Sequence, residues 1–137
     1  MADLLLDTCA VIWTGNGDPI SEDATQALNA TFRDGRQTLV SPFTAWELGM
    51  LVARARLRLT RPVPDWFDDY IERGQLTLAE LSPRILVESS FLPGKPPADP
   101  ADRIILATAR AHNLKVITRD TQILAYAEEG HVNAIAC

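Results

Sequence analysis

The apolar positions of this chain fall into short continuous runs that alternate with longer stretches of helical periodicity. Runs of strand length occur at residues 3–6, 38–40, 76–78, 115–118 and 132–135. Amphipathic helices are expected over residues 10–13, 21–33, 41–56, 65–73, 82–91, 99–113 and 121–128. Strands that alternate with helices predict a mostly parallel sheet covered on both faces. We therefore expect an α/β fold, with all 137 residues in a single domain.

Helix ends and loops follow from the capping and turn residues. Ser21, Ser41-Pro42, Ser82-Pro83 and Asp99-Pro100 match the pattern of an N-cap, in three cases with proline at the first helical position. The helix over 21–33 is expected to bury Ala24, Ala27, Leu28 and Phe32 on one face. Pro62 and Pro64 are expected to break the chain, and residues 92–98 to form a loop.

Four acidic residues, far apart in sequence, occupy positions where this fold would place a ligand. Asp7 ends the first strand, Glu47 lies in the helix after the second, Asp102 opens the 99–113 helix, and Asp120 follows the 115–118 strand. Ligands of open α/β sheets bind beyond the carboxyl ends of the strands. Four carboxylates gathered there would repel one another. A hard divalent cation such as Mg²⁺ or Mn²⁺ would neutralise them and prefers oxygen ligands.

Each acid also has a purely structural interpretation. Asp7 and Asp120 could each cap the helix that follows. Glu47 lies at helical spacing from Phe43, Met50 and Leu51, so it faces the packed side, where Arg54 could be its partner.

Asp99 and Asp102 could together begin their helix as cap and third residue. Asp102 nevertheless shares a face with Ile105, Leu106 and Ala109, so it is expected to point inward while Asp99 stays at the rim.

Composition narrows the class of protein. The chain is 47% hydrophobic and 23% charged, and no apolar run reaches the length of a membrane span. The first residues carry no basic segment, which argues against a signal peptide. Cys9 and Cys137 show no metal-binding spacing, so we expect Cys9 to be a small buried residue and Cys137 a tail residue, with no disulfide between them, in a reducing cytoplasm.

The net charge of −5 is unusual for a protein that binds nucleic acid. Its cations are, however, 11 Arg and only 2 Lys, and Arg54, Arg56, Arg58 and Arg61 fall within one short segment. Arginine is well suited to bidentate phosphate contacts. The segment is therefore either a phosphate-binding surface or a solvated helix end.

Several motifs resemble those of the PIN-domain ribonucleases, and within them the VapC-type toxins of prokaryotic toxin–antitoxin pairs. The similar stretches are LLLDT at 4–8, SPFTAWELGML at 41–51, LPG at 92–94, DPADRIILATAR at 99–110 and VITRD at 116–120. The acidic quartet of the family maps onto Asp7, Glu47, Asp102 and Asp120, and its Ser/Thr near the fourth acid maps onto Thr118. Where many relatives carry a polar residue before the Asp-Pro pair, this chain has Pro-Pro-Ala.

The resemblance implies a three-layer α/β/α sandwich, RNA cleavage with Mg²⁺ or Mn²⁺, a homodimer without membrane contact, and a VapB-like antitoxin that blocks the site. The quartet would be both catalytic and metal-binding, with Thr8, Thr118 and Asp99 around it. Water activated by the metal would attack the phosphodiester in line. Arg54, Arg58, Arg103 and Arg119 are candidate RNA contacts, and surface ion pairs are the alternative for Arg103 and Arg119.

Three other classes of protein compete with this hypothesis. A haloacid dehalogenase-like phosphatase needs a second Asp where this chain has Cys9. A response-regulator receiver needs a phosphate-accepting Asp at a central strand end, and residues 38–41 offer none, although Lys95-Pro96 is present. A catalytically inactive PIN-like module that only binds RNA or protein remains open.

Overall fold

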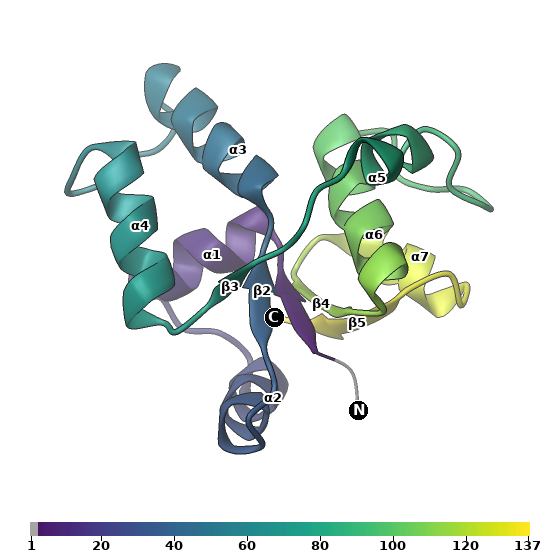
Figure 1. Cartoon of the computed structure of the whole chain (residues 1–137), viewed down its shortest axis with the longest axis horizontal. Coiled ribbons are helices and arrows are strands. Elements are labelled where there is room, and N and C mark those ends of the chain that lie inside the picture. Colours follow the sequence, from purple (N-terminus) through teal and green to yellow (C-terminus); the bar gives the residue numbers. More distant parts are fainter. Residues whose placement is uncertain (1–2) are drawn as a thin grey trace.

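A computed structural model describes residues 3–137 (Figure 1). The strands are β1 (Leu4–Leu6), β2 (Thr38–Val40), β3 (Thr77–Leu78), β4 (Lys115–Thr118) and β5 (Asn133–Ala136). They form one sheet of order β3-β2-β1-β4-β5 in which all pairs are parallel. The helices are α1 (Thr8–Gly15), α2 (Glu22–Arg33), α3 (Pro42–Ala53), α4 (Val63–Arg73), α5 (Pro83–Glu88), α6 (Pro100–His112) and α7 (Thr121–Glu128). The expected α/β fold with a parallel sheet is confirmed.

The central strand, β1, divides the core into two halves. Leu4 and Leu6 pack with α1, α2, α3 and α4 on one face of the sheet, whereas Leu5 packs with α6 and α7 on the other. In Figure 1 the α1, α3 and α4 side lies to the left and the α5, α6 and α7 side to the right. Strands buried on both faces read as continuous apolar runs, which explains the three successive leucines. The sandwich expected from the resemblance is therefore present.

Strand register brings distant residues to one edge of the sheet. Leu6 pairs with Val40 on one side and with Ile117 on the other. The residue after Leu6 is Asp7, so this carboxylate emerges at the middle of the carboxyl-terminal edge. From β1 the chain continues outward through β2 and β3 on one side of the sheet, and then through β4 and β5 on the other side. An open α/β sheet forms its ligand crevice at such a reversal of strand order, which here lies between β1 and β4.

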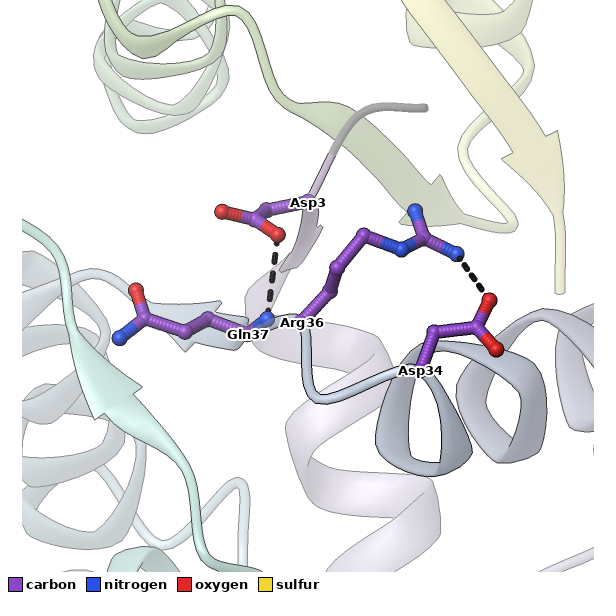
Figure 2. Close-up of polar contacts among 4 residues, drawn as sticks. All are labelled: Asp3, Asp34, Arg36 and Gln37. Carbon is purple, nitrogen blue, oxygen red and sulfur yellow. Dashed lines mark hydrogen bonds and ion pairs between the residues drawn. The ribbon is translucent and has the colours of Figure 1, made fainter.

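The opposite edge of the sheet is fixed by an acid of its own. Figure 2 shows Asp3 Oδ1 accepting a hydrogen bond from the backbone N–H of Gln37 over 3.1 Å, which links the starts of β1 and β2. In the same view Arg36 pairs with Asp34 at 3.2 Å, in the turn that leads into β2. Asp3 therefore has a structural role at the end of the sheet remote from the quartet.

Several predicted boundaries were wrong by a turn or less. Pro64 does not break the chain but lies in the first turn of α4, where a missing N–H costs nothing. α5 ends at Glu88 instead of near Phe91, because the backbone N–H groups of Ser90 and Phe91 bond to carbonyls three residues back, over 3.0 and 2.9 Å, and no longer four residues back. Phe32 is 63% exposed, since the inward face of α2 ends at Thr31.

Among residues 3–137, no helix has both the length and the apolarity required to cross a bilayer.

Candidate active site

Asp7 is held in place by two hydrogen bonds at the end of β1. Its Oδ1 accepts from the backbone N–H of Ala10 over 2.8 Å, which caps α1, and its Oδ2 accepts from the Thr118 hydroxyl over 2.5 Å. Burial raises the pKa of Asp7, these two hydrogen bonds partly offset that rise, and the charge of Asp120 adds to it. The predicted capping role and a place in the cluster thus coexist in one side chain.

Thr118 links Asp7 to Asp120. Its side chain is fully buried at the end of β4, and its oxygen accepts the Asp120 backbone N–H over 3.0 Å while its hydroxyl donates to Asp7. Asp120 Oδ1 caps α7 by accepting from Gln122 N and Ile123 N, over 2.8 and 3.0 Å. No hydrogen bond from residues 3–137 reaches its Oδ2, which leaves that oxygen available to a ligand.

Glu47 is a half-buried carboxylate on α3. Its Oε1 accepts from the hydroxyl of Thr8 over 2.5 Å. Burial raises the pKa of Glu47, the Thr8 hydrogen bond lowers it, and Asp99 and Asp7 raise it further. Arg54 is exposed and forms no ion pair among the described residues, so it is not the structural partner considered from the sequence.

Asp102 is a half-buried carboxylate whose pKa is raised by burial and by the other acids. It lies in the first turn of α6, half-buried, whereas Asp99 is exposed and caps the helix by accepting from Ala101 N over 3.3 Å. Burial raises the pKa of Asp102 to about 7, with further contributions from Asp120, Asp99, Glu47 and Asp7. The sequence-based placement, Asp102 inward and Asp99 at the rim, agrees with the structure.

The thiol of Cys9 lies within the field of all four acids. Its pKa is raised to about 11, first by burial and then by Asp7, Glu47, Asp102 and Asp120. The side chain is nevertheless exposed at the surface, so the cluster opens to solvent beside it. The sequence interpretation treated Cys9 as a small buried residue, and that was wrong.

The quartet is not balanced by protein cations. The five ion pairs formed within residues 3–137 leave out Asp7, Glu47, Asp102 and Asp120. As these side chains lie, no three carboxylate, imidazole or thiol groups of that part of the chain are close enough to hold one ion directly. The mutual pKa effects show that they are near enough to repel. An oxygen-only donor set in which the pKa values of Asp7, Glu47 and Asp102 are raised, and which has no counter-charge, suits a hard divalent cation that would draw the groups together.

Two of the four candidate RNA-binding arginines are engaged in the fold. Arg103 donates from Nε to the Pro97 carbonyl over 2.7 Å. Arg119 donates from Nε to the Cys137 carbonyl over 2.9 Å and from Nη2 to the Pro19 carbonyl over 3.2 Å. Its guanidinium also lies 3.7 Å from the centre of the Trp13 ring. Neither forms an ion pair within residues 3–137, so the ion-pair alternative was wrong for both.

The connection between α3 and α4 presents arginines to solvent. Leu57 and Leu59 are partly buried against the core, and Arg54, Arg56 and Arg58 between and before them are exposed. Arg61 pairs with Asp69 at 3.5 Å, whereas the other three form no ion pair among the described residues. We call Arg54, Arg56 and Arg58 the arginine strip. Its anchored backbone and free guanidinium groups suit phosphate contact better than an unanchored helix end would.

Comparison with known proteins shows which family this sequence and fold resemble. Ribonuclease VapC22 of Mycobacterium tuberculosis is 28% identical over 127 residues, which cover 92% of this chain and 93% of that protein. A toxin–antitoxin complex from Klebsiella pneumoniae contains a chain 26% identical, with a TM-score of 0.64 over 97% of this chain and 96% of that one. VapBC2 from Rickettsia felis, bound to a DNA fragment from its promoter, shares the fold with a TM-score of 0.70 over 97% of both chains at 15% identity. The PIN domain family model matches residues 4–129, and the chain belongs to the PIN domain family.

Proposed function

We propose that this protein is a divalent-metal-dependent endoribonuclease of the VapC type, acting in the cytoplasm as the toxin of a toxin–antitoxin pair. The observation that carries the proposal is the uncompensated acidic quartet at the carboxyl-terminal edge of the sheet. Membership of the PIN family and the similarity to Ribonuclease VapC22 support the reaction class. The nucleic-acid substrate is RNA by this similarity, and the arginine strip would contact its phosphates.

In the proposed site, Asp7, Asp102, Asp120 and Glu47 would hold Mg²⁺ or Mn²⁺. When bound, the cation would supply a Lewis acid for the scissile phosphate and for the attacking water. Thr118 and the Ala10 N–H keep Asp7 oriented, and Thr8 does the same for Glu47. Attack by water breaks the bond from phosphorus to the 3′ oxygen, so the products carry a 5′-phosphate and a 3′-hydroxyl. No side chain of the protein needs to act as a nucleophile.

The test is cleavage of a labelled RNA by purified protein with Mg²⁺, with Mn²⁺ and with excess chelator, alongside Asp102→Asn. We expect cleavage that depends on the ion and is lost in the variant, with 5′-phosphate products. Cleavage that persists in chelator would refute the metal mechanism. RNA binding without cleavage under every ion condition would instead favour a catalytically inactive module.

We also propose a docking groove for the antitoxin between α3 and α4. Ala45, Gly49, Val63, Pro64 and Phe67 are among the residues that line an apolar groove of about 440 Å³. Trp46, stacked on Phe43 at 5.0 Å, is 56% exposed on the same helix. An apolar helix of a VapB-like partner could occupy this groove and place a basic side chain among the acids. The toxin–antitoxin complex from Klebsiella pneumoniae, similar over nearly the whole chain, supports a partner of this kind.

Gly49 allows this groove to be tested without damage to the fold. A Cβ at Gly49 would meet nothing within 4 Å, so Gly49→Leu fills the groove and replaces a poor helix former. We expect the variant to fold at least as stably as the parent, to keep RNA cleavage, and to lose co-purification with the small protein encoded beside it. Gly49→Ala is the control. Unchanged capture by Gly49→Leu would place the antitoxin elsewhere.

We propose that the protein is a homodimer and that α5 contributes to the interface. Leu86, Val87 and Phe91 are exposed, with Phe91 at 79%. Leu86 and Val87 lie on α5 and Phe91 just after its end, and exposed apolar side chains gathered in one region are typical of an interface. Sedimentation of the parent and of Phe91→Ser tests this, and a parent that sediments as a monomer at all concentrations would refute it.

A further inference from the structure

A buried threonine on α3 lies next to the hydroxyl that holds Glu47. Thr44 is fully buried, one helical turn before Glu47, and its Oγ1 is 3.1 Å from Oγ1 of Thr8. Thr8, at the first position of α1, is in turn 2.5 Å from Oε1 of Glu47. The three side chains form a continuous path from the inside of α3, across to α1, and back to the carboxylate.

The direction of these hydrogen bonds follows from the number of protons available. A threonine hydroxyl donates one hydrogen bond, and ionised Glu47 can only accept. The Thr8 proton is therefore committed to Glu47, so in the contact between the two threonines Thr44 must donate and Thr8 must accept. Each bond in such a chain polarises the next one.

We infer that Thr44 is a positioning residue for the metal-ligating carboxylate of Glu47, acting through Thr8. This inference rests on the proposed function for the role of Glu47. Thr44 fixes the rotamer of Thr8 by donating to its oxygen, and Thr8 then fixes the carboxylate. Without the Thr44 hydroxyl, the buried oxygen of Thr8 has no hydrogen-bond donor. Rotation of the Thr8 side chain toward another donor would then lower its free energy.

Asp7 and Glu47 are thus supported in parallel ways from opposite sides of the site. Thr118 reaches Asp7 from β4, and the Thr44–Thr8 pair reaches Glu47 from within α3. Outer groups that orient a metal ligand commonly change metal affinity by about 10–100-fold. The Thr44–Thr8 pair is expected at the lower end of that range, because it acts on one ligand of four.

The experiment uses Thr44→Val, which removes the hydroxyl at nearly constant volume, and Thr44→Ser, which keeps it. Thr108→Val is the matched control, because Thr108 is equally buried and, within residues 3–137, its hydroxyl hydrogen-bonds only to the Ile104 carbonyl of its own helix. Two quantities are measured: the χ1 rotamer of Thr8 from three-bond couplings to its methyl carbon in metal-free protein, and the dissociation constant for Mn²⁺.

We expect Thr44→Val to average the Thr8 rotamer and weaken Mn²⁺ binding by about tenfold. Thr44→Ser and Thr108→Val should match the parent in both quantities. If Thr44→Val does not fold, Thr44→Ala removes the same donor with a smaller side chain. A single Thr8 rotamer in the hydroxyl-free variant would overturn the inference, as would an equal loss of affinity in Thr108→Val. A parent that binds no Mn²⁺ would refute the proposed function, while the couplings in metal-free protein would still decide the role of Thr44.

Discussion

The hydroxyl of Thr118 donates to Oδ2 of Asp7 over 2.5 Å, across a sequence separation of 111 residues. The two side chains meet because β1 and β4 are paired in parallel with Leu6 opposite Ile117, so Asp7 and Thr118 are the next residue of each segment. One buried hydrogen bond therefore joins the acid at the end of the first strand to the strand that presents Asp120.

Removing that hydroxyl should affect both stability and the site. Thr118→Val leaves Asp7 without its donor and the Asp120 N–H without its acceptor, so we expect a loss of about 1–3 kcal/mol in the free energy of unfolding. The pKa of Asp7, already raised by burial, should rise further. Thr118→Ser should recover most of the stability. Urea unfolding measures the first effect, and an unchanged midpoint in Thr118→Val would contradict it.

The raised pKa of Asp102 predicts how metal-free stability depends on pH. The folded pKa is about 7, against 3.8 for an unperturbed Asp side chain, so the folded state binds more protons between those pH values. The contribution of Asp102 to the free energy of unfolding is then fully present below about pH 4 and is lost as the pH rises through 7. Asp102→Asn should reduce this dependence, leaving the part due to Asp7 and Glu47, and should be more stable at pH 8 by about 1–2 kcal/mol, after allowance for solvent screening.

Thermal unfolding in chelator at pH 5, 6, 7 and 8 tests that prediction. Glu88→Gln is a suitable control, because Glu88 pairs with Arg84 on an exposed surface outside the cluster. Parallel curves for the parent and Asp102→Asn would show that the cluster does not repel as proposed.

Charge reversal of the arginine strip should weaken RNA binding and reduce its dependence on salt. The slope of log affinity against log salt falls by about 0.7–0.9 for each phosphate that the protein no longer neutralises. We expect Arg54→Glu, Arg56→Glu and Arg58→Glu together to lower this slope by about two units or more. Arg33→Glu, Arg73→Glu and Arg84→Glu form a charge-matched control on other helices. Equal slopes for the two triple variants would show that the arginine strip is an ordinary solvated surface that does not contact RNA phosphates.

Ala55 occupies a backbone conformation that favours glycine. Its φ is 56°, just after α3 ends, in the left-handed region where a Cβ is unfavourable. Ala55→Gly should raise the free energy of unfolding by up to about 1 kcal/mol. The substitution also leaves the neighbouring arginines in place, so RNA binding should not change. A lower unfolding midpoint would show that Ala55 is not strained.

The sequence pattern located the strands and the cluster because both depend on local rules. Three consecutive leucines can be buried on both sides only in an inner strand, and parallel strands bring their ends to one edge, so Asp7 and Asp120 were correctly placed at the carboxyl-terminal edge of the sheet. The faces of the helices were less certain. Phe32 was expected inside and Thr31 is buried instead, because one residue of rotation about α2 exchanges them.

The sequence pattern could not predict contacts between segments that are far apart in the chain. The sequence shows Thr44 on the same face as Glu47, yet only the packing of α1 against α3 places Thr8 between them. Likewise, nothing near Arg119 in sequence indicates that it would lie over Trp13 and donate to the carbonyl of Cys137. The exposure of Cys9 was also missed, since an apolar neighbourhood in sequence does not reveal an opening in space.

Because β1 divides the core into two halves, a cation bound by the quartet would connect helices on the two faces of the sheet. Glu47 belongs to a helix packed on one face of the sheet, and Asp102 to a helix packed on the other. An ion shared by these carboxylates would act as a clasp across the edge of the sheet, and ion at a hundred times its dissociation constant would add about 2.7 kcal/mol to folding. The amide protons of α3 and α6 should then exchange more slowly when the ion is bound, and both helices should slow in parallel as the ion concentration rises.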